Sequence, residues 1–179
     1  MLIDCKDFKL RELKKSDAKS VAKHANNYKI KRYLTDSFPH PYTLQDFLAF
    51  YELCNSANDL VCAVETKGEA AGIISLSLKK GMEKPAAEIG YWLGEKYWGK
   101  GIMARAVKEM VKYGFENFNY LNKIFAHIYD FNTNSQKAIE KAGFYKNTVF
   151  KEHIVAEEKL RDVFFYELFR KDYEANYKL

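Results

Sequence analysis

The middle of the chain combines a strand, a glycine-rich turn and an amphipathic helix in immediate succession. The apolar run Glu88-Ile-Gly-Tyr-Trp-Leu-Gly94 predicts a strand, and the turn after it reads Trp98-Gly-Lys-Gly-Ile-Met-Ala104. Beyond the turn, apolar residues recur at spacings of three and four, as in a helix with one buried face: Val107, Met110, Val111, Gly114 and Phe118. The first N–H groups of a helix lack partners and lie at the positive end of its dipole. The arrangement therefore predicts a phosphate or pyrophosphate site.

Two phosphate-binding motifs fit these glycines only in part. The segment Gly94 to Lys100 matches the start of a P-loop, but Gly101 stands where a Ser or Thr hydroxyl would hold magnesium. The segment Gly99 to Ala104 fits the dinucleotide pattern G-x-G-x-x-G/A, with Asp130 as a candidate ribose ligand. A dinucleotide turn follows its strand almost at once, whereas residues 95–98 intervene here.

The segment Trp98 to Met103 also resembles the Q/R-x-x-G-x-G/A signature of the GNAT acetyltransferases. Trp98 stands at the Gln/Arg position, as in the W-G-K-G variant of the Rim-type branch, which acetylates N-terminal amines of ribosomal proteins and other substrates. Met103 replaces the final small residue. The segment Asn132 to Phe144 resembles the N-x-x-S…E-K-x-G-F segment of that branch. Other landmarks follow in the same order as in the branch: Leu10 to Leu13 with Asp17, Pro41 to Thr43, and Arg161 to Tyr166.

This resemblance implies a single α+β domain over residues 1–179 with the GNAT fold. Its central sheet is expected to be mixed, mostly antiparallel, of about seven strands, with helices on both faces. The strands at 88–93 and 123–129 are expected to splay apart and admit the cofactor arm. Hairpins predicted upstream of Glu88 argue against a dinucleotide domain, in which strand and helix alternate. With 47% hydrophobic residues, the chain can form a sizeable core.

Local signals predict how several elements begin and end. Ser16 is expected to cap the first helix, and Thr43-x-x-Asp46 resembles a capping box before the next. The polar stretch 155–161 is expected to be a loop between the last two strands. The tail from Lys171 is expected to be loosely held.

Composition excludes several classes of protein. The formal net charge of +5 comes from charges scattered along the chain, so it does not indicate a nucleic-acid surface. Three cysteines lack metal-ligand spacing and the four histidines form no cluster in sequence, so no metal is expected. The sequence has no signal-peptide pattern and no apolar run of membrane length. We therefore expect a cytoplasmic protein that acts without a membrane, as a monomer or homodimer.

The resemblance implies acetyl-CoA as the cofactor, with coenzyme A as the product. Backbone N–H groups of six consecutive residues after Trp98 would receive the pyrophosphate: Gly99, Lys100, Gly101, Ile102, Met103 and Ala104. A plain helix-entry turn is the alternative for these glycines. Backbone groups around Leu93 would pair with the pantetheine amides, and its N–H could hold the oxyanion. Asn132 matches a pantetheine-binding position, although its spacing to Ser135 also fits a helix cap.

Acetyl transfer to an amine requires removal of a proton from nitrogen and stabilisation of the leaving thiolate. Glu88 resembles the general base of several family members, and a partly desolvated cleft is expected to raise its pKa. The alternative is a strand acid held in a salt bridge. Ile139 stands where many members carry a Tyr, so Ser135 is the hydroxyl that the resemblance places beside the thiol. A Ser hydroxyl is a weak acid, so Ser135 would relay a proton or donate a hydrogen bond to the thiolate.

We therefore expect an N-acetyltransferase that moves the acetyl group of acetyl-CoA to a primary amine by direct attack in a ternary complex. The acceptor is either a protein N-terminus or a small amine. A non-catalytic acyl-CoA-binding sensor or scaffold is the alternative, favoured by Ile139 and Met103, and a dinucleotide-binding oxidoreductase is a third interpretation. An aromatic group forms either one wall of the acceptor site or ordinary packing against the sheet: Tyr28, Tyr33, Phe38 and Tyr42, with His40.

Overall fold

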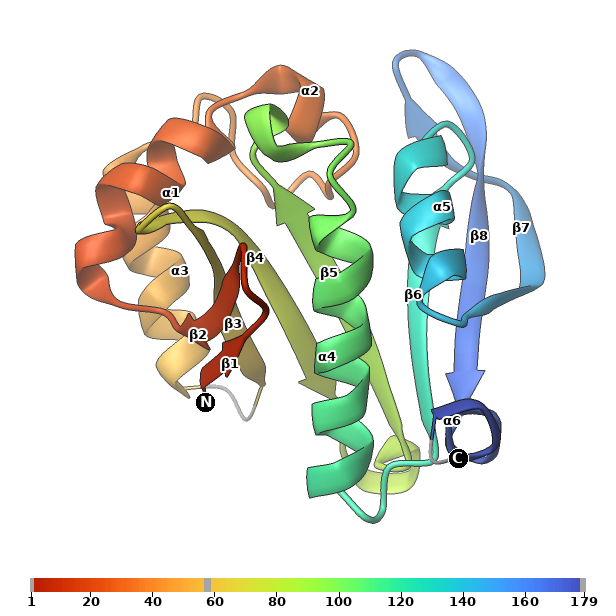
Figure 1. Ribbon diagram of the computed structural model, residues 1–179. Coiled ribbons are helices and arrows are strands. Elements are labelled where there is room, and N and C mark those ends of the chain that lie inside the picture. Colours follow the sequence, from red (N-terminus) through yellow and green to blue (C-terminus); the bar gives the residue numbers. More distant parts are fainter. Residues whose placement is uncertain (1, 57–58, 178–179) are drawn as a thin grey trace.

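The computed structural model describes residues 2–56 and 59–177, which form one twisted eight-stranded sheet with α-helices on both faces (Figure 1). The strands are β1 (Leu2–Asp4), β2 (Lys9–Glu12), β3 (Leu60–Thr66), β4 (Glu69–Leu78), β5 (Ala86–Leu93), β6 (Lys123–Tyr129), β7 (Tyr145–Ala156) and β8 (Lys159–Phe169). The α-helices are α1 (Ala18–Ala25), α2 (Tyr28–Lys31), α3 (Leu44–Ser56), α4 (Ile102–Asn117), α5 (Thr133–Lys141) and α6 (Arg170–Tyr177). The predicted α+β class and mixed, mostly antiparallel sheet are confirmed. The additional strand relative to the predicted seven is β1.

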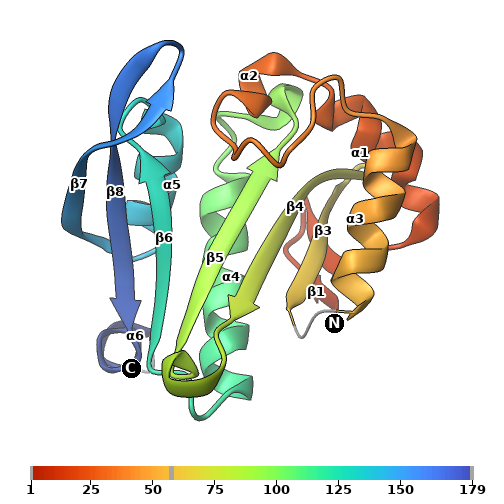
Figure 2. The ribbon, with the colours of Figure 1, turned by 180° about the vertical axis from the view of Figure 1, so that it is seen from behind.

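The sheet divides between β5 and β6. The strand order is β1-β2-β3-β4-β5-β6-β8-β7, and β5 and β6 form its parallel pair. They pair only at Ala86↔Lys123, Ala87↔Ile124 and Glu88↔Phe125, and then diverge (Figure 2). The predicted splay between residues 88–93 and 123–129 is confirmed.

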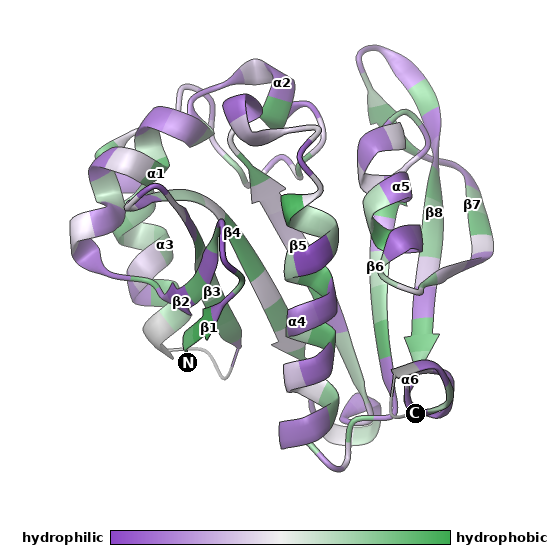
Figure 3. Cartoon of the chain, in the orientation of Figure 1, coloured by the Kyte–Doolittle hydropathy of each residue, from purple (hydrophilic) through white to green (hydrophobic). Residues whose placement is uncertain are grey.

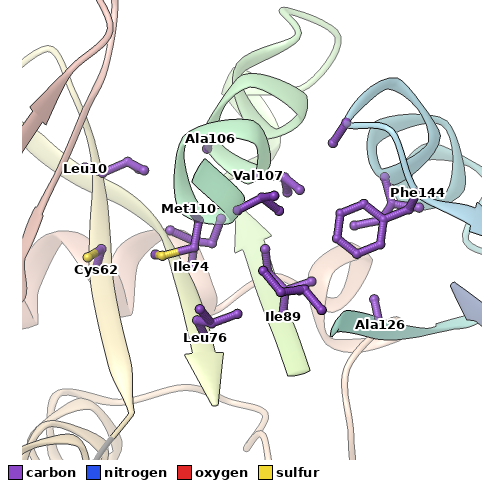
Figure 4. Close-up of a cluster of buried hydrophobic side chains, with 14 of the residues drawn as sticks. Leu10, Cys62, Ile74, Leu76, Ile89, Ala106, Val107, Met110, Ala126 and Phe144 are labelled. Atoms are coloured by element: carbon purple, nitrogen blue, oxygen red, sulfur yellow. The ribbon is translucent and has the colours of Figure 1, made fainter. Parts of the chain in front are cut away.

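Two hydrophobic clusters pack on opposite faces of the sheet. On one face, Val107 and Met110 of α4 pack against Ile74 and Leu76 of β4 (Figure 4). Hydrophilic and hydrophobic residues alternate along α4, as expected for a helix with one buried side (Figure 3). A Cβ on Gly114 would lie 2.8 Å from a Leu76 methyl carbon, which shows how closely the helix approaches the sheet.

The opposite face carries the second cluster. Val21 of α1 and Phe47 of α3 pack there with Ala63 and Ile73, and all four are buried. Because successive residues of a strand point to opposite faces, Ile73 and its neighbour Ile74 serve different clusters. The helices α1 and α3 therefore cover the face that α4 leaves open.

The first helix begins differently from the prediction. Ser16 does not cap it: the chain enters through a 3₁₀ turn (Lys15–Asp17), and the Asp17 carboxylate accepts from Lys14 N–H at 2.8 Å and from the Arg11 guanidinium at 2.8 Å. An internal ion pair determines this end of the helix. The predicted capping box of α3 is confirmed, because Thr43 N–H donates to Asp46 at 2.7 Å and Asp46 N–H donates to Thr43 Oγ1 at 3.3 Å.

Both predictions for the C-terminal region were wrong. Most of the predicted loop at 155–161 belongs to the β7–β8 hairpin, whose turn is made by Glu157 and Glu158 with φ of 53° and 61°. Instead of a loose tail, residues 170–177 form α6. Tyr173 is buried with its ring centroid 5.2 Å from that of Phe115. The Arg170 guanidinium donates at 2.8 Å to three carbonyls at the end of α4 and just beyond it: Phe115, Phe118 and Leu121.

Candidate active site

The glycine-rich turn presents open N–H groups at the start of α4. Gly99 and Gly101 have φ of 74° and 70°, a region that residues with a Cβ rarely adopt. Gly101 is the N-cap and no side chain caps the helix. The bond from Arg105 N–H to Gly101 O, at 3.2 Å, is of the i to i−4 type. The N–H groups of residues 102–104 come before this first bond, so they are the helix-end donors without a partner inside the helix. A Cβ on Gly99 or Gly101 would meet nothing within 4 Å, so the space around the turn is open.

The end of β5 is fixed by Trp98, whose indole N–H donates to Leu93 O at 2.6 Å. Gly94 N–H donates to Ala71 O at 2.8 Å, so residue 94 forms a hydrogen-bonded pair with β4. In an antiparallel ladder such pairs alternate, so the N–H and C=O groups of residues 89, 91 and 93 point away from β4 and into the gap beside β6. The Leu93 N–H thus faces the gap, as the sequence analysis required of an oxyanion donor.

A cavity of about 1100 Å³ occupies this gap and is lined from both faces of the sheet. On the face of α4 and α5 its lining includes Met103 and Ser135. On the opposite face it includes Ser75, Gly90 and Trp92. The predicted site residues that line it are Glu88, Leu93, Trp98, Gly99, Gly101, Ile102, Met103, Ala104, Asn132 and Ser135. The lining does not include Lys100, whose ammonium lies 5.4 Å from the centre of the Tyr97 ring.

Asn132 and Ser135 meet at the start of α5. The Asn132 Oδ1 accepts from Ser135 N–H at 3.2 Å, so the helix-capping alternative for Asn132 is confirmed. The Ser135 hydroxyl lies 2.8 Å from the hydroxyl of Tyr91 on β5. The capping contact uses Oδ1, which leaves the Asn132 amide N–H groups as the donors suited to a pantetheine carbonyl.

Glu88 is held by two basic side chains, His127 and Lys79. Its Oε1 lies 2.9 Å from His127 Nδ1, and its Oε2 accepts from the Lys79 ammonium at 2.8 Å. His127, and after it Lys79, outweigh the effect of burial and lower the pKa of Glu88 to about 2. The expectation of a raised pKa was therefore wrong, and the salt-bridged alternative describes the structure.

Only some of the aromatic residues predicted to lie near the acceptor site line the cavity. Phe38 packs on Tyr42 at 4.8 Å and edge-on to Trp92 at 6.1 Å between ring centroids, and Tyr42 is buried. Tyr28 is exposed and lies against His40. Phe38 and Tyr42, but not Tyr28, line the cavity, so one part of the group forms a wall.

An ion pair bridges the open end of the gap. The Arg32 guanidinium, which follows α2, lies 2.8 Å from Glu157 in the β7–β8 turn. The same guanidinium lies 5.8 Å from the centre of the Phe131 ring, and Arg161 lies 5.1 Å from that centre. These contacts join the segment after α2 to the β7–β8 hairpin, on the other side of the gap.

Several cavity residues were not identified from sequence. Lys137 and Lys141 line it from α5, and their spacing of four residues places them on one helix face, a signal that could have been used. His127 and Tyr91 also line it. Each reaches its partner, Glu88 or Ser135, through strand register or helix placement, which sequence spacing does not reveal.

A family model described as "Acetyltransferase (GNAT) domain" matches residues 7–145. The chain belongs to the GNAT acetyltransferase family. It is an acetyl-CoA-dependent N-acetyltransferase, so the oxidoreductase interpretation and the non-catalytic alternative are both set aside. The chemistry of the turn, with open backbone N–H groups and no hydroxyl for magnesium, agrees with a coenzyme A pyrophosphate.

Several known proteins are similar to this GNAT enzyme along most of its length. "Uncharacterized N-acetyltransferase p20" of Bacillus licheniformis is 28% identical over 92% of this chain and 93% of its own length. Spermidine N(1)-acetyltransferase of Escherichia coli strain K12 is 30% identical over 76% of this chain and 72% of its own length. The structure of ribosomal-protein-S5-alanine acetyltransferase from Vibrio fischeri has the same fold, with a TM-score of 0.80 at 24% identity, covering 96% and 98% of the two chains.

Two kinds of feature are absent from residues 2–56 and 59–177. In these ranges no helix combines the length and apolar character needed to cross a membrane. No group of three or more His, Cys, Asp or Glu side chains in the same ranges is arranged to hold a metal ion.

Proposed function

We propose that this GNAT enzyme transfers the acetyl group to a primary amine by direct attack within a ternary complex. The observation that carries the proposal is the single cavity lined from both faces of the sheet. It lets the thioester enter from the side of α4 and α5 while the amine approaches from the side of Glu88 and Trp92. No covalent intermediate is needed when both reactants reach one gap.

The cysteines support direct attack. Burial raises the pKa of the Cys54 thiol to about 11 and that of the Cys62 thiol to about 12. The pKa of the half-buried Cys5 thiol is also raised, mainly by burial. A nucleophilic cysteine requires a thiolate, and these environments oppose its formation.

Coenzyme A would be held along the α4 side of the gap. The N–H groups of residues 99–104 would receive its pyrophosphate, and Lys137 and Lys141 would add positive charge from α5. Asn132 would donate to the pantetheine arm, and the Leu93 N–H would stabilise the oxyanion. When bound, the cofactor supplies the activated acetyl group.

Glu88 would act on the amine proton together with His127. A carboxylate whose pKa is about 2 is a weak base at neutral pH, so Glu88 alone is poorly suited to the task. If Glu88 accepts from His127 Nδ1–H, the imidazole Nε2 is left to take the proton. Glu88 then orients the base and stabilises its charged form.

The acceptor class is a protein N-terminus or a small amine. The cavity wall on this side is mainly aromatic and aliphatic, and its two acidic side chains are Glu88, already paired, and Asp46, which caps α3. The named relatives include enzymes for both a ribosomal protein and spermidine.

The proposal is tested by offering N-terminal peptides, spermidine and monoamines as acceptors. Acetyl transfer to each is measured by the free thiol of coenzyme A that it releases. For the best acceptor, double-reciprocal plots at several acetyl-CoA concentrations are expected to intersect. Parallel lines would indicate an acyl-enzyme and would contradict direct attack.

A further inference from the structure

Tyr91 is a cavity tyrosine that the chemistry described so far does not use. It lies on β5 with its side chain toward α5. Its one phenol proton has two acceptors there: Ser135 O at 3.3 Å, and the nearer Ser135 Oγ at 2.8 Å, a contact in which either oxygen can be the donor. Burial is the main cause that raises the pKa of Tyr91 to about 12, so the phenol stays protonated at neutral pH. Its proton is therefore available for donation at neutral pH.

The position at which many family members carry a tyrosine hydroxyl has no hydroxyl in this chain. Ile139, at the position where many family members carry a Tyr, is fully buried in the core and offers no polar group. Tyr166, a buried tyrosine nearby, donates instead to Glu140 at 3.0 Å. Tyr91 is thus the phenol whose contact with Ser135 the structure records.

We propose that Tyr91 is a positioning residue that donates to Ser135 Oγ and so directs the Ser135 hydroxyl proton at the sulfur of coenzyme A. A serine hydroxyl has one proton and rotates freely unless its oxygen is engaged. With Tyr91 as donor, Ser135 is left to donate its own proton elsewhere. This inference rests on the role proposed above for Ser135.

Acetyl transfer forms one bond, breaks another and releases protons. The amine nitrogen forms a bond to the acetyl carbon, the carbon–sulfur bond breaks, and its electron pair stays on sulfur as a thiolate. Ser135 donates a hydrogen bond to that thiolate, and Tyr91 keeps its own proton. An ammonium substrate loses two protons in total: one goes to solvent, and the other balances the proton that the thiolate takes up when coenzyme A leaves as the free thiol.

The inference predicts a property of bound coenzyme A that does not depend on turnover. A donor aimed at the sulfur favours the thiolate, so the pKa of the bound thiol falls. Ultraviolet absorbance of the thiolate, titrated with coenzyme A on the wild type, Tyr91→Phe, Ser135→Ala and the double variant, measures that pKa. Tyr166→Phe is the matched control, because it also removes one tyrosine hydroxyl close to α5. Desulfo-coenzyme A provides the blank.

We expect Tyr91→Phe and Ser135→Ala each to raise the pKa of the bound thiol by about one unit, with no further rise in the double variant. In turnover, kcat of Tyr91→Phe is expected to fall about tenfold with little change in KM for acetyl-CoA. Desulfo-coenzyme A is expected to bind all variants alike, which shows that the site is intact.

The outcomes separate the two proposals. If Ser135→Ala raises the thiol pKa and Tyr91→Phe does not, the role of Tyr91 is overturned and that of Ser135 stands. If neither variant changes it, both roles are overturned, while acetyl transfer by direct attack is judged by the kinetic plots. An equal rise in Tyr166→Phe would show a general packing effect and would also overturn the role of Tyr91.

Discussion

His127 Nδ1 lies 2.9 Å from Glu88 Oε1, on neighbouring parallel strands that separate just beyond this contact. The pair therefore lies at the narrow end of the gap, beside the cavity. Lys79, on the other side of Glu88, completes a cluster in which one carboxylate contacts an imidazole and an ammonium group.

Replacing either member of the pair is expected to slow turnover. Glu88→Gln and His127→Gln are each expected to lower kcat about 100-fold at pH 7, with acetyl-CoA affinity nearly unchanged, since a general base is lost or misoriented. The double variant is expected to be no slower than His127→Gln, because the two act as a unit. Steady-state kinetics measures this. Additive losses would show that Glu88 and His127 act separately.

The low pKa of Glu88 makes stability depend on pH in a defined direction. Its folded pKa of about 2 lies below the ordinary value of 4.5, so its contribution is complete above pH 4.5 and is lost as the pH falls toward 2. Between these values, the free energy of unfolding is expected to fall less steeply in Glu88→Gln than in the wild type. Urea unfolding at several pH values measures the slope. Glu83→Gln, an exposed carboxylate, serves as control, and an identical slope in Glu88→Gln would contradict the pairing.

Gly101→Asp is expected to abolish tight binding of coenzyme A while the fold survives. A Cβ there meets no neighbour within 4 Å, so the fold loses only about 1 kcal/mol from the left-handed backbone. The added carboxylate opposes the pyrophosphate at the positive end of α4. Gly101→Asn is the matched control for shape, and calorimetry gives both affinities. Equal affinity in the Asp and Asn variants would place the phosphates elsewhere.

The α5 lysines are expected to contribute through charge. Lys137→Ala and Lys141→Ala each remove a cation from the cavity lining, so affinity for coenzyme A is expected to fall about three- to tenfold at low salt. The difference from the wild type is expected to shrink as salt increases. Lys112→Ala, an exposed lysine of α4, is the control. A loss of affinity that persists at high salt would indicate a packing role.

Arg170→Met is expected to destabilise the fold by about 2 kcal/mol or more. It removes charge-assisted donors from three carbonyls at and beyond the end of α4 while keeping much of the side-chain volume. Lys171→Met, next in the chain and exposed, is the control. Chemical denaturation gives both values, and equal stability of the two variants would show that α6 adds little to the fold.

Features that depend on short segments were predictable. The turn around Gly99 and Gly101 needs left-handed backbone, and the amphipathic pattern of α4 is visible within four turns. The splay of the sheet was predicted from the order of the motifs along the chain, which resembles that of the GNAT family. The helix α6 was missed because its sequence is polar and one buried ring, Tyr173, anchors it. The strand β1 is too short for alternation to show.

The chemistry of the gap was harder to predict because it depends on register. Lys79 and His127 lie nine and thirty-nine residues from Glu88, and only the pairing of β4, β5 and β6 brings the three together. The sequence pattern identifies Glu88 as an acid in an apolar strand, but it does not identify the side chains that contact it. The direction of the pKa shift depends on those contacts, so it could not be predicted from the sequence pattern.

The contact between Arg32 and Glu157 joins the two halves of the sheet a second time. Three residue pairs of β5 and β6 join the halves at one end of the gap, and this ion pair joins them at the other end. Both side chains are about one-third exposed, and ion pairs of this type contribute about 1 kcal/mol or less. This second connection between the halves of the sheet is therefore weak, and it weakens further as ionic strength increases.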